Sequence, residues 1–440
     1  MNSNQQTVPG RRASFLARTA VRLGAAAVLA GLAPGSQAAE TAAATPSPNG
    51  ATSVAEEPVK GVDDHLLDTF KNGKFNLNVR LRWEHADQEG LDASDAVTVR
   101  PRFGFTTAPL YGFQGMIEGE NVTSLGAPYN PAGLDPNEAG RTVIADPETT
   151  EINQAWLSYS RWDSMVRGGR QRIVLDDHRF VGDVDWRQNQ QTYDGAVFSS
   201  EFIKRTTVFY AYLDRVDKVS GSAHPLGRFE SDSHLVDLSY NACDAAHLGA
   251  YAYLLDFDNA PANSSHTFGG RLTGKWKPHE DWALSYRGEF AWQTGAGNNP
   301  VDYSAPFYRV DVQANRNPIL FGVGYETLGS DSGRFGFQTP LATLHKFNGW
   351  ADMFLVTPTA GLRDLNGRIG VTLPYATPLQ FVYHHFWSDN GDMDFGQEYD
   401  AVISHKFGKY FTTLAKVAWY EGESGYPDKL VFWLEADFKY

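Results

Sequence analysis

The sequence has a single cysteine, Cys243, so it cannot form an internal disulfide. Beyond the N-terminal region it has no stretch of about 18 apolar residues, which excludes transmembrane helices. Positive charge is scarce as well: 38 Lys and Arg stand against 52 Asp and Glu, and the net charge of -14 excludes nucleic acid as a partner. A membrane protein of this composition could cross the bilayer only with β-strands, of which alternate residues face lipid.

Catalytic and metal-binding motifs are absent too. The sequence has no GxSxG, no HExxH, no CxxC and no glycine-rich phosphate loop. His384–His385 and Ser404–His405 are adjacent pairs, whose side chains would point to opposite faces of a strand. We therefore predict that the protein is not an enzyme and that it has no catalytic residues, no metal site and no cofactor.

The first 38 residues have the three parts of an export signal. Four arginines precede or border the short apolar run 23–33, and small residues follow at Ser36, Ala38 and Ala39. This order predicts a secretory signal peptide over residues 1–38. Residues 39–73 come next and begin with mostly Ala, Thr, Pro, Ser and Gly, a composition that cannot pack a core. We expect residues 39–73 to be a periplasmic or disordered lead.

From residue 74 onward, segments of the sequence alternate apolar and polar side chains with the period of a β-strand. The last eleven residues are the clearest example. One face would carry Phe432, Leu434, Ala436, Phe438 and Tyr440, and the other Trp433, Glu435, Asp437 and Lys439. A strand with one apolar and one charged face suits a barrel wall between lipid and water, and an aromatic last residue is typical of the closing strand.

Segments of this kind recur about 18 times, without an interrupting linker. The connections between them alternate in length. Short links at 109–110, 161–162, 277–280 and 406–409 are expected to be periplasmic turns, and long ones at 123–149, 173–191, 216–231 and 328–362 to be extracellular loops. Residues 74–440 are therefore predicted to form one all-β domain, a transmembrane antiparallel β-barrel of about 18 strands (16–18), in the bacterial outer membrane. A soluble secreted β-protein is the alternative.

Five runs of the sequence carry a family resemblance: 113–122, 145–155, 169–182, 186–194 and 349–354. Together they resemble the alginate-export family of bacterial outer-membrane porins, and the resemblance extends from about residue 75 to Tyr440. It implies an eighteen-stranded barrel that conducts an anionic polysaccharide through an arginine-lined bore. These runs are characteristic of the family but do not specify alginate as the solute.

Alternation also predicts which side chains line the bore. The predicted pore-lining residues are Arg80, Arg82, Arg100, Arg102, Glu118, Glu120, Arg271, Arg287, Glu289, Arg309 and Arg368. Arginine keeps its charge and binds carboxylate through two parallel hydrogen bonds, so such a lining would favour anions. In the competing interpretation the lumenal acids pair with these arginines across strands and cancel much of the field. The sequence leaves both interpretations open.

The connection at 173–191 is unusually rich in charged and aromatic residues for an exposed loop. We interpret it as a constriction loop that folds into the bore, with Asp176, Asp177, Arg179, Trp186 and Arg187 as its functional residues. The alternative is a loop packed against its neighbours outside the barrel.

The sequence thus predicts an outer-membrane porin that conducts a hydrophilic, anionic solute of saccharide or uronate type by passive diffusion. A general diffusion porin without saccharide preference is the closest rival. Outer-membrane lipid, lipopolysaccharide and the barrel assembly machinery are the expected partners. Monomer and trimer both fit the sequence.

Overall fold

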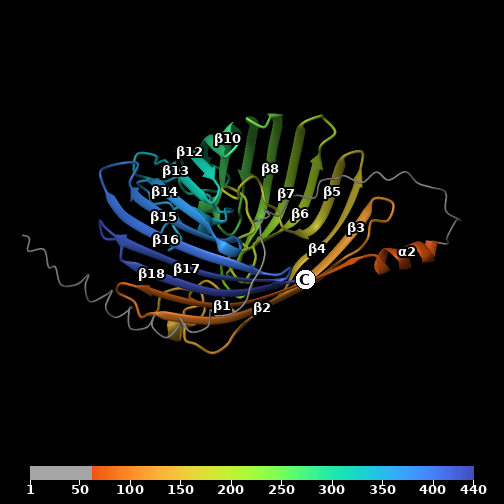
Figure 1. Cartoon of the computed structure of the whole chain (residues 1–440), viewed down its shortest axis with the longest axis horizontal. Helices are drawn as coiled ribbons and strands as arrows, with labels where there is room; N and C mark the ends of the chain where they lie inside the picture. Colours follow the sequence, from red (N-terminus) through yellow and green to blue (C-terminus); the bar gives the residue numbers. More distant parts are fainter. Residues whose placement is uncertain (1–61) are drawn as a thin grey trace, which may run out of the picture.

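The computed structural model describes residues 62–440, so the predicted signal peptide lies outside the described residues. One sheet contains all the strands of this region, in the order β1 to β18 around the barrel, and β1 pairs with both β2 and β18. Every pairing is antiparallel, and the sheet has no free edge (Figure 1). The predicted 18-stranded antiparallel barrel is confirmed.

The strands are β1 (Lys74–Gln88), β2 (Ser94–Thr106), β3 (Phe113–Ser124), β4 (Thr149–Arg161), β5 (Ser164–Gln171), β6 (Thr192–Ser200), β7 (Thr206–Asp217), β8 (Arg228–Cys243), β9 (Ala246–Leu255), β10 (Ser265–His279), β11 (Trp282–Gly295), β12 (Ser304–Arg316), β13 (Ile319–Leu328), β14 (Leu362–Leu373), β15 (Thr377–Trp387), β16 (Asp394–Phe407), β17 (Phe411–Gly422) and β18 (Lys429–Lys439). The helix is α2 (Val62–Lys71), and single 3-10 turns are η1 (Pro136–Glu138), η2 (Pro261–Asn263), η3 (Leu344–Lys346) and η4 (Pro374–Ala376). Within residues 62–440, no helix has the length and apolar content needed to cross a bilayer.

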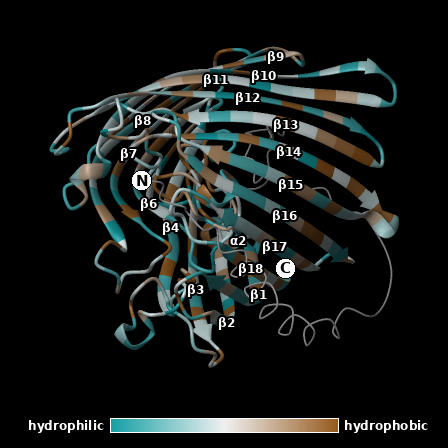
Figure 2. Cartoon of the chain, turned by 90° about the vertical axis from the view of Figure 1, so that its left-hand side faces the viewer, coloured by the Kyte–Doolittle hydropathy of each residue, from teal (hydrophilic) through white to brown (hydrophobic). Residues whose placement is uncertain are grey.

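The two faces of the wall are the reverse of those of a soluble protein. On β1, Leu81 is 45% exposed on the outer face, while the neighbouring Arg82 is 1% exposed on the inner face. Leu81 lies opposite Val99 of β2, and the outward pattern continues to Phe103. Figure 2 shows the same alternation of hydrophobic and hydrophilic residues along the strands. Lipid outside and a polar lumen inside account for this arrangement.

Connections alternate between the two ends of the barrel as predicted. Two-residue turns at 162–163, 244–245 and 280–281 lie at one end, and the connections 125–148, 172–191 and 329–361 lie at the other. We call these the short-turn end and the long-loop end.

Helix α2 shows that the disordered interpretation does not hold for residues 62–71 of the predicted lead. Its Thr69 carbonyl oxygen accepts a hydrogen bond from the Ala108 amide (3.0 Å) in the β2–β3 turn. The Phe70 ring stacks on Phe105 with centroids 6.2 Å apart. A helix forms here because Leu66, Leu67 and Phe70 have helical spacing, a signal that the composition of the whole lead conceals. The rest of the lead up to residue 61 lies outside the described residues.

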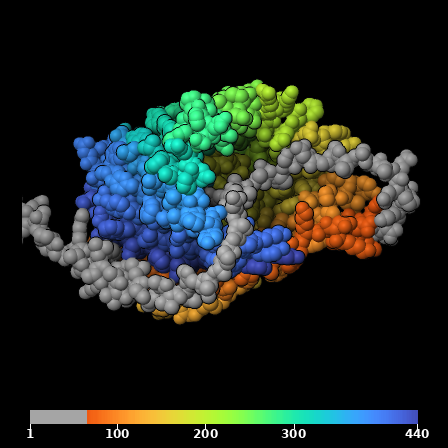
Figure 3. All heavy atoms as spheres, viewed as in Figure 1, coloured from red at the N-terminus to blue at the C-terminus, as the bar shows by residue number. Residues whose placement is uncertain are grey.

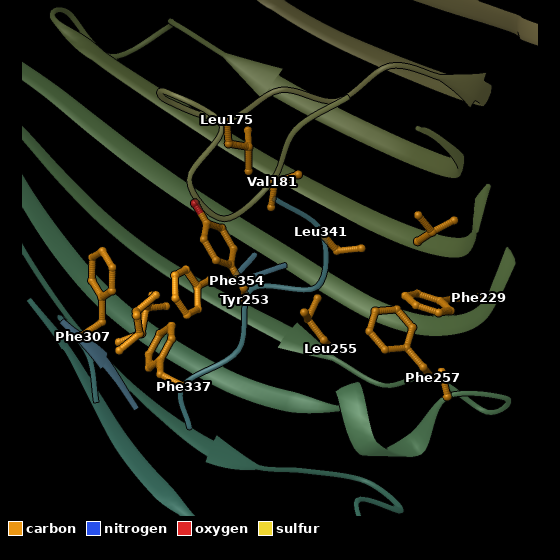
Figure 4. Close-up of a cluster of buried hydrophobic side chains, with 14 of the residues drawn as sticks. Leu175, Val181, Phe229, Tyr253, Leu255, Phe257, Phe307, Phe337, Leu341 and Phe354 are labelled. Atoms are coloured by element: carbon orange, nitrogen blue, oxygen red, sulfur yellow. The ribbon is translucent and has the colours of Figure 1, made fainter. Parts of the chain in front are cut away.

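The apolar core lies inside the barrel, where two inserted loops meet. Figure 4 shows Val181 of the 172–191 loop beside Leu341 of the 329–361 loop, among aromatic side chains of the wall. The Gly182 amide donates to the Leu341 carbonyl (2.9 Å), and the Thr343 amide donates to the His178 carbonyl (3.1 Å). The two loops are thus joined through their backbones.

The 329–361 loop, predicted as an extracellular connection at 328–362, folds into the barrel. Phe337 and Leu341 are both fully buried. Phe337 packs against Phe307 of the wall and Phe180 of the other loop, with ring centroids 5.5 and 6.0 Å apart. The physical reason is the apolar content of this loop, which is removed from water only by folding inward.

Candidate functional site

Four arginines gather where the barrel closes. Strands β1 and β2 place Arg80 directly opposite Arg100, with Arg82 and Arg102 beside them. We call these four residues the seam arginines. Strand β18 supplies two of their partners: Arg82 Nη2 lies 2.6 Å from Glu435 Oε2, and Arg80 Nε lies 3.2 Å from Asp437 Oδ2.

Strand β3 supplies a further partner, since Arg102 Nη2 lies 2.7 Å from Glu120 Oε2. The predicted lumenal Glu118 is buried beside Glu120, but among residues 62–440 no arginine pairs with it directly. Its Oε1 accepts hydrogen bonds from the Asn153 and Gln154 side chains (2.8 and 2.9 Å). Glu118 is therefore held in a polar network of amides.

The 172–191 loop docks on the seam arginines through Asp185. Asp185 Oδ1 lies 3.1 Å from Arg102 Nη1 and 3.6 Å from Arg100 Nη1, and its carbonyl accepts from Arg80 Nη1 (2.8 Å). Burial alone would raise the pKa of Asp185, yet Arg102 and Arg80 hold that pKa well below its ordinary value. The seam arginines thus stabilise a carboxylate that reaches them from a loop.

A second group of arginines lies on later strands of the barrel, β10, β11, β12 and β14. We call Arg271, Arg287, Arg309 and Arg368 the arginine row. Wall acids pair with its members: Arg271 Nη2 lies 2.7 Å from Asp237, and Arg368 Nη2 lies 2.7 Å from Asp311. Arg309 also contacts Asp311 (2.6 Å), and Arg287 contacts the predicted lumenal residue Glu289 (3.0 Å).

The tip of the 172–191 loop inserts two carboxylates into this row. Arg287 Nη1 lies 2.6 Å from Asp176 Oδ2, and Arg309 Nη1 lies 2.7 Å from Asp177 Oδ2. Burial would raise the pKa of Asp177, but Arg309 and Arg287 hold it well below its ordinary value. Both arginine clusters therefore bind carboxylates presented by the same loop.

Two other predicted loop residues, Arg179 and Arg187, form ion pairs of their own. Arg179 pairs with Glu326 of β13 (2.7 Å), and Arg187 pairs with Glu84 of β1 (3.1 Å) and with Asp352 of the other loop (2.8 Å). Glu326 and Glu84 are buried wall residues, so their pairs fix the loop to the wall, and the pair with Asp352 joins it to the other inserted loop. The charged loop thus has two parts: an acidic tip, with Asp176 and Asp177, and a docking part, with Arg179 and Arg187.

Two cavities adjoin the arginine row. The larger, about 570 Å³, extends from the short turns at Pro109 and Asp163 to Asp176 at the loop tip, and Arg271 lines it. The smaller, about 390 Å³, is lined by the other three members of the row together with Lys275 and Gln313. His247 and Thr273 line both. The row thus faces the space in the short-turn half of the lumen.

A lysine that sequence reasoning did not select anchors both loops. Lys416 of β17 lies with Nζ 3.8 Å from the Trp350 ring centroid and 4.1 Å from that of Trp186. Its Nζ is 2.7 Å from His345 Nε2. Burial lowers the pKa of His345 to about 3, so this imidazole is neutral and accepts the hydrogen bond. Trp186 and Trp350 in the two loops were the sequence signal for such a contact, because a buried lysine over an indole ring is a recurrent interaction.

Most of the lumenal acids named above pair with arginines, and in the described residues they are not grouped as metal ligands. Across residues 62–440, no group of three or more His, Cys, Asp and Glu side chains is placed to hold a metal ion. The structure brings the predicted lumenal arginines together with acids as ion pairs, which favours the interpretation in which acids offset the arginines. That they line a conducting pore stays a prediction.

Solved structures with a similar fold are outer-membrane proteins. The chain resembles OpdK of Pseudomonas aeruginosa, solved with vanillate, at a TM-score of 0.66 and 14% identity, over 84% of this chain and 99% of that one. It resembles OccAB2 of Acinetobacter baumannii at a TM-score of 0.67 and 14% identity, over 85% of this chain and 99% of that one. At this identity the likeness concerns the fold.

A comparison with curated protein sequences finds no match. The sequence model of the alginate export family, in contrast, matches residues 74–409, which is most of the barrel. The resemblance in the five sequence runs is thereby confirmed, and the soluble alternative is set aside. The protein is an outer-membrane β-barrel that belongs to the alginate export family.

Proposed function

We propose that this protein is a passive porin for small hydrophilic solutes that carry a carboxylate, such as a uronate or another sugar acid. The solute diffuses down its gradient through the part of the lumen that the inserted loops leave open. No energy source and no chemical step are required, so the protein is not an enzyme. Lipopolysaccharide and the barrel assembly machinery stay its predicted partners.

One observation carries this proposal: the wall arginines already bind carboxylates. Asp176 and Asp177 occupy the arginine row, and Asp185 occupies the seam arginines. The pKa values of Asp177 and Asp185 are lowered in spite of burial, so the surrounding charge is favourable to an anion at both places. A diffusing carboxylate of similar size would find the same forked donors. Vanillate, bound in the similar OpdK structure, is also a carboxylate.

The closest rival is a general diffusion porin, in which paired charges leave no preference. The wall acids Asp237 and Asp311 support that rival, because they offset part of the row, and Glu326 also lies 3.9 Å from Arg309 Nε. The two proposals differ in ion selectivity and in block by uronates.

Planar bilayers containing the protein would separate them. Under a KCl gradient we expect a reversal potential of the sign that marks anion preference, and we expect glucuronate to reduce the current more than glucose at equal concentration. Arg287→Gln with Arg309→Gln should shift the reversal potential toward cations. Arg161→Gln is the matched control, because Arg161 is exposed at the short-turn end of β4. Cation preference in the unaltered protein, or equal block by both sugars, would refute carboxylate selectivity.

A further inference from the structure

Helix α2 lies outside the barrel wall, against the β2–β3 turn at the short-turn end. Figure 1 shows it beyond the ends of the strands, and Figure 3 shows its residues at the rim of the barrel body. Besides the Thr69 hydrogen bond and the Phe70 stacking described above, the His65 ring meets the Tyr111 ring edge-on, with centroids 6.1 Å apart. These three contacts fix the helix to the wall.

The apolar side of the helix stays largely exposed, although Phe70 stacks on Phe105 of the wall. Thr69 is buried at the contact, whereas Leu66, Leu67 and Phe70 are 43, 55 and 58% exposed. These three residues lie within about 100° of one another around the helix axis, so they form one apolar strip. The helix contacts the wall through Thr69, and its leucines point away from the wall. In water this strip would remain hydrated, which is unfavourable for apolar side chains.

The strip continues a surface that already faces lipid. Phe75 and Phe103 on the outer wall are each 55% exposed, which is within the range of the helix residues. Exposed aromatic residues at Tyr111 and Trp162 mark the same end of the barrel, as expected at the boundary between acyl chains and headgroups. Helix α2 therefore adjoins the edge of the lipid-facing band at the short-turn end.

We propose that α2 is an interfacial anchor, which lies in the headgroup boundary of the phospholipid leaflet at the short-turn end with Leu66, Leu67 and Phe70 inserted among the acyl chains. The helix is about 15 Å long and is too short to span a bilayer. The exposed Lys74 at the start of β1 is placed to meet lipid phosphates. The proposal concerns how the barrel sits in the membrane and is independent of which solute it conducts.

The single cysteine makes a direct test possible. In full-length protein carrying Cys243→Ser and reconstituted in phosphatidylethanolamine–phosphatidylglycerol vesicles, one spin label is placed at Leu67→Cys or Phe70→Cys. Phe103→Cys is the lipid-facing control and Lys71→Cys the control for the polar side of the helix. Collision rates with oxygen, which partitions into lipid, are compared with those of a water-soluble nickel chelate.

We expect labels at 67 and 70 to show an oxygen-to-nickel collision ratio close to that at 103 and severalfold above that at 71. A ratio at 67 and 70 equal to that at 71 would overturn the proposal, since the strip would then face water. Shielding of 67 and 70 from both reagents would also overturn it, because a second copy or another protein would then cover the strip. Leu66→Cys provides a third labelled position, and heat-modifiable gel mobility verifies that each variant has folded.

Discussion

Arg287 holds Asp176 with both of its terminal nitrogens, Nη1 to Oδ2 at 2.6 Å and Nη2 to Oδ1 at 3.1 Å. The two residues are 111 positions apart, one on the barrel wall and one at the tip of the 172–191 loop. A forked pair of this kind is how arginine binds a free carboxylate. Asp176, with Asp177 on Arg309, is therefore in effect a tethered ligand of the arginine row.

Removing this tethered ligand should strengthen binding of an external one. Charged hydrogen bonds contribute about 1.5–3 kcal/mol each, and recovering about 1 kcal/mol of this for a diffusing carboxylate lowers its half-blocking concentration about fivefold. We expect that effect for glucuronate block of the Asp176→Asn, Asp177→Asn double variant in planar bilayers. Asp331→Asn, at an exposed pair with Arg334, is the control. Unchanged or weaker block in the double variant would show that the tip does not compete with solute.

Gly182 should be intolerant of a side chain. A Cβ added there would lie 2.2 Å from Thr343 Oγ1 and 3.1 Å from the Thr343 amide nitrogen. Gly182→Val must therefore separate the two inserted loops, at a cost of about 1–3 kcal/mol. We expect a larger single-channel conductance with more open-channel noise. Gly140→Val is the matched control, because a Cβ there meets no atom within 4 Å. Identical conductance in both variants would mean that the joined loops do not limit the current.

Lys416→Met should loosen the anchor of both loops while keeping the length of the side chain. It removes a buried amine that lies over Trp186 and Trp350, a contact of about 2 kcal/mol for the protonated amine shielded from water. We expect increased protease cleavage within 329–361 and more current fluctuation. Lys409→Met, which removes a lysine over Tyr410 at the short-turn end, should change neither. Cleavage as slow as in the unaltered protein would contradict the anchoring role.

His345 should make stability depend on pH. Burial lowers its pKa to about 3 from the ordinary 6.5, so below 6.5 the unfolded chain binds a proton that the folded state does not. The stability contribution is therefore complete above pH 6.5 and falls toward pH 3, by about 1.4 kcal/mol per pH unit. Urea midpoints of tryptophan fluorescence in vesicles, from pH 7 to 4.5, would measure this slope. His345→Gln should flatten it, and an equal slope in that variant would assign the pH dependence elsewhere.

The loop carboxylates should not respond to pH over that interval. The pKa values of Asp177 and Asp185 lie below their ordinary 3.8, so their stabilising ion pairs are fully present above 3.8 and are lost only as the pH falls through the lowered values. Between pH 7 and 4.5 we expect constant ion selectivity in planar bilayers. A change of selectivity near pH 5 would contradict this prediction, since it would require a carboxylate at these places whose pKa is raised above 3.8.

The wall of this protein could be predicted from the sequence because the alternation along each strand shows which of its side chains face inward. Alternation alone places Arg82 inside and Leu81 outside, whichever strands are neighbours. The partner of Arg82 could not be predicted in that way. Glu435 is 353 residues away, and only the register of barrel closure brings the two together.

The inserted loops show where sequence reasoning stops. The 172–191 loop was suspected from its charge, but its contact with Leu341 depends on a second loop that has no periodic pattern. Helix α2 was missed for a related reason. Its ten residues follow a long segment of Ala, Pro and Ser, and composition read over the whole lead hides a short helical strip.

The seam arginines also constrain the order in which the molecule can fold. Arg80 bonds Asp437 of the last strand and the Asp185 carbonyl of the 172–191 loop, and Arg82 bonds Glu435 of the last strand and the Trp186 carbonyl of the same loop. The complete docking site for this loop exists only once the first and last strands have met. Loop insertion is therefore completed after the wall has closed, and a barrel trapped before closure would keep a lumen that its own loop has not yet filled.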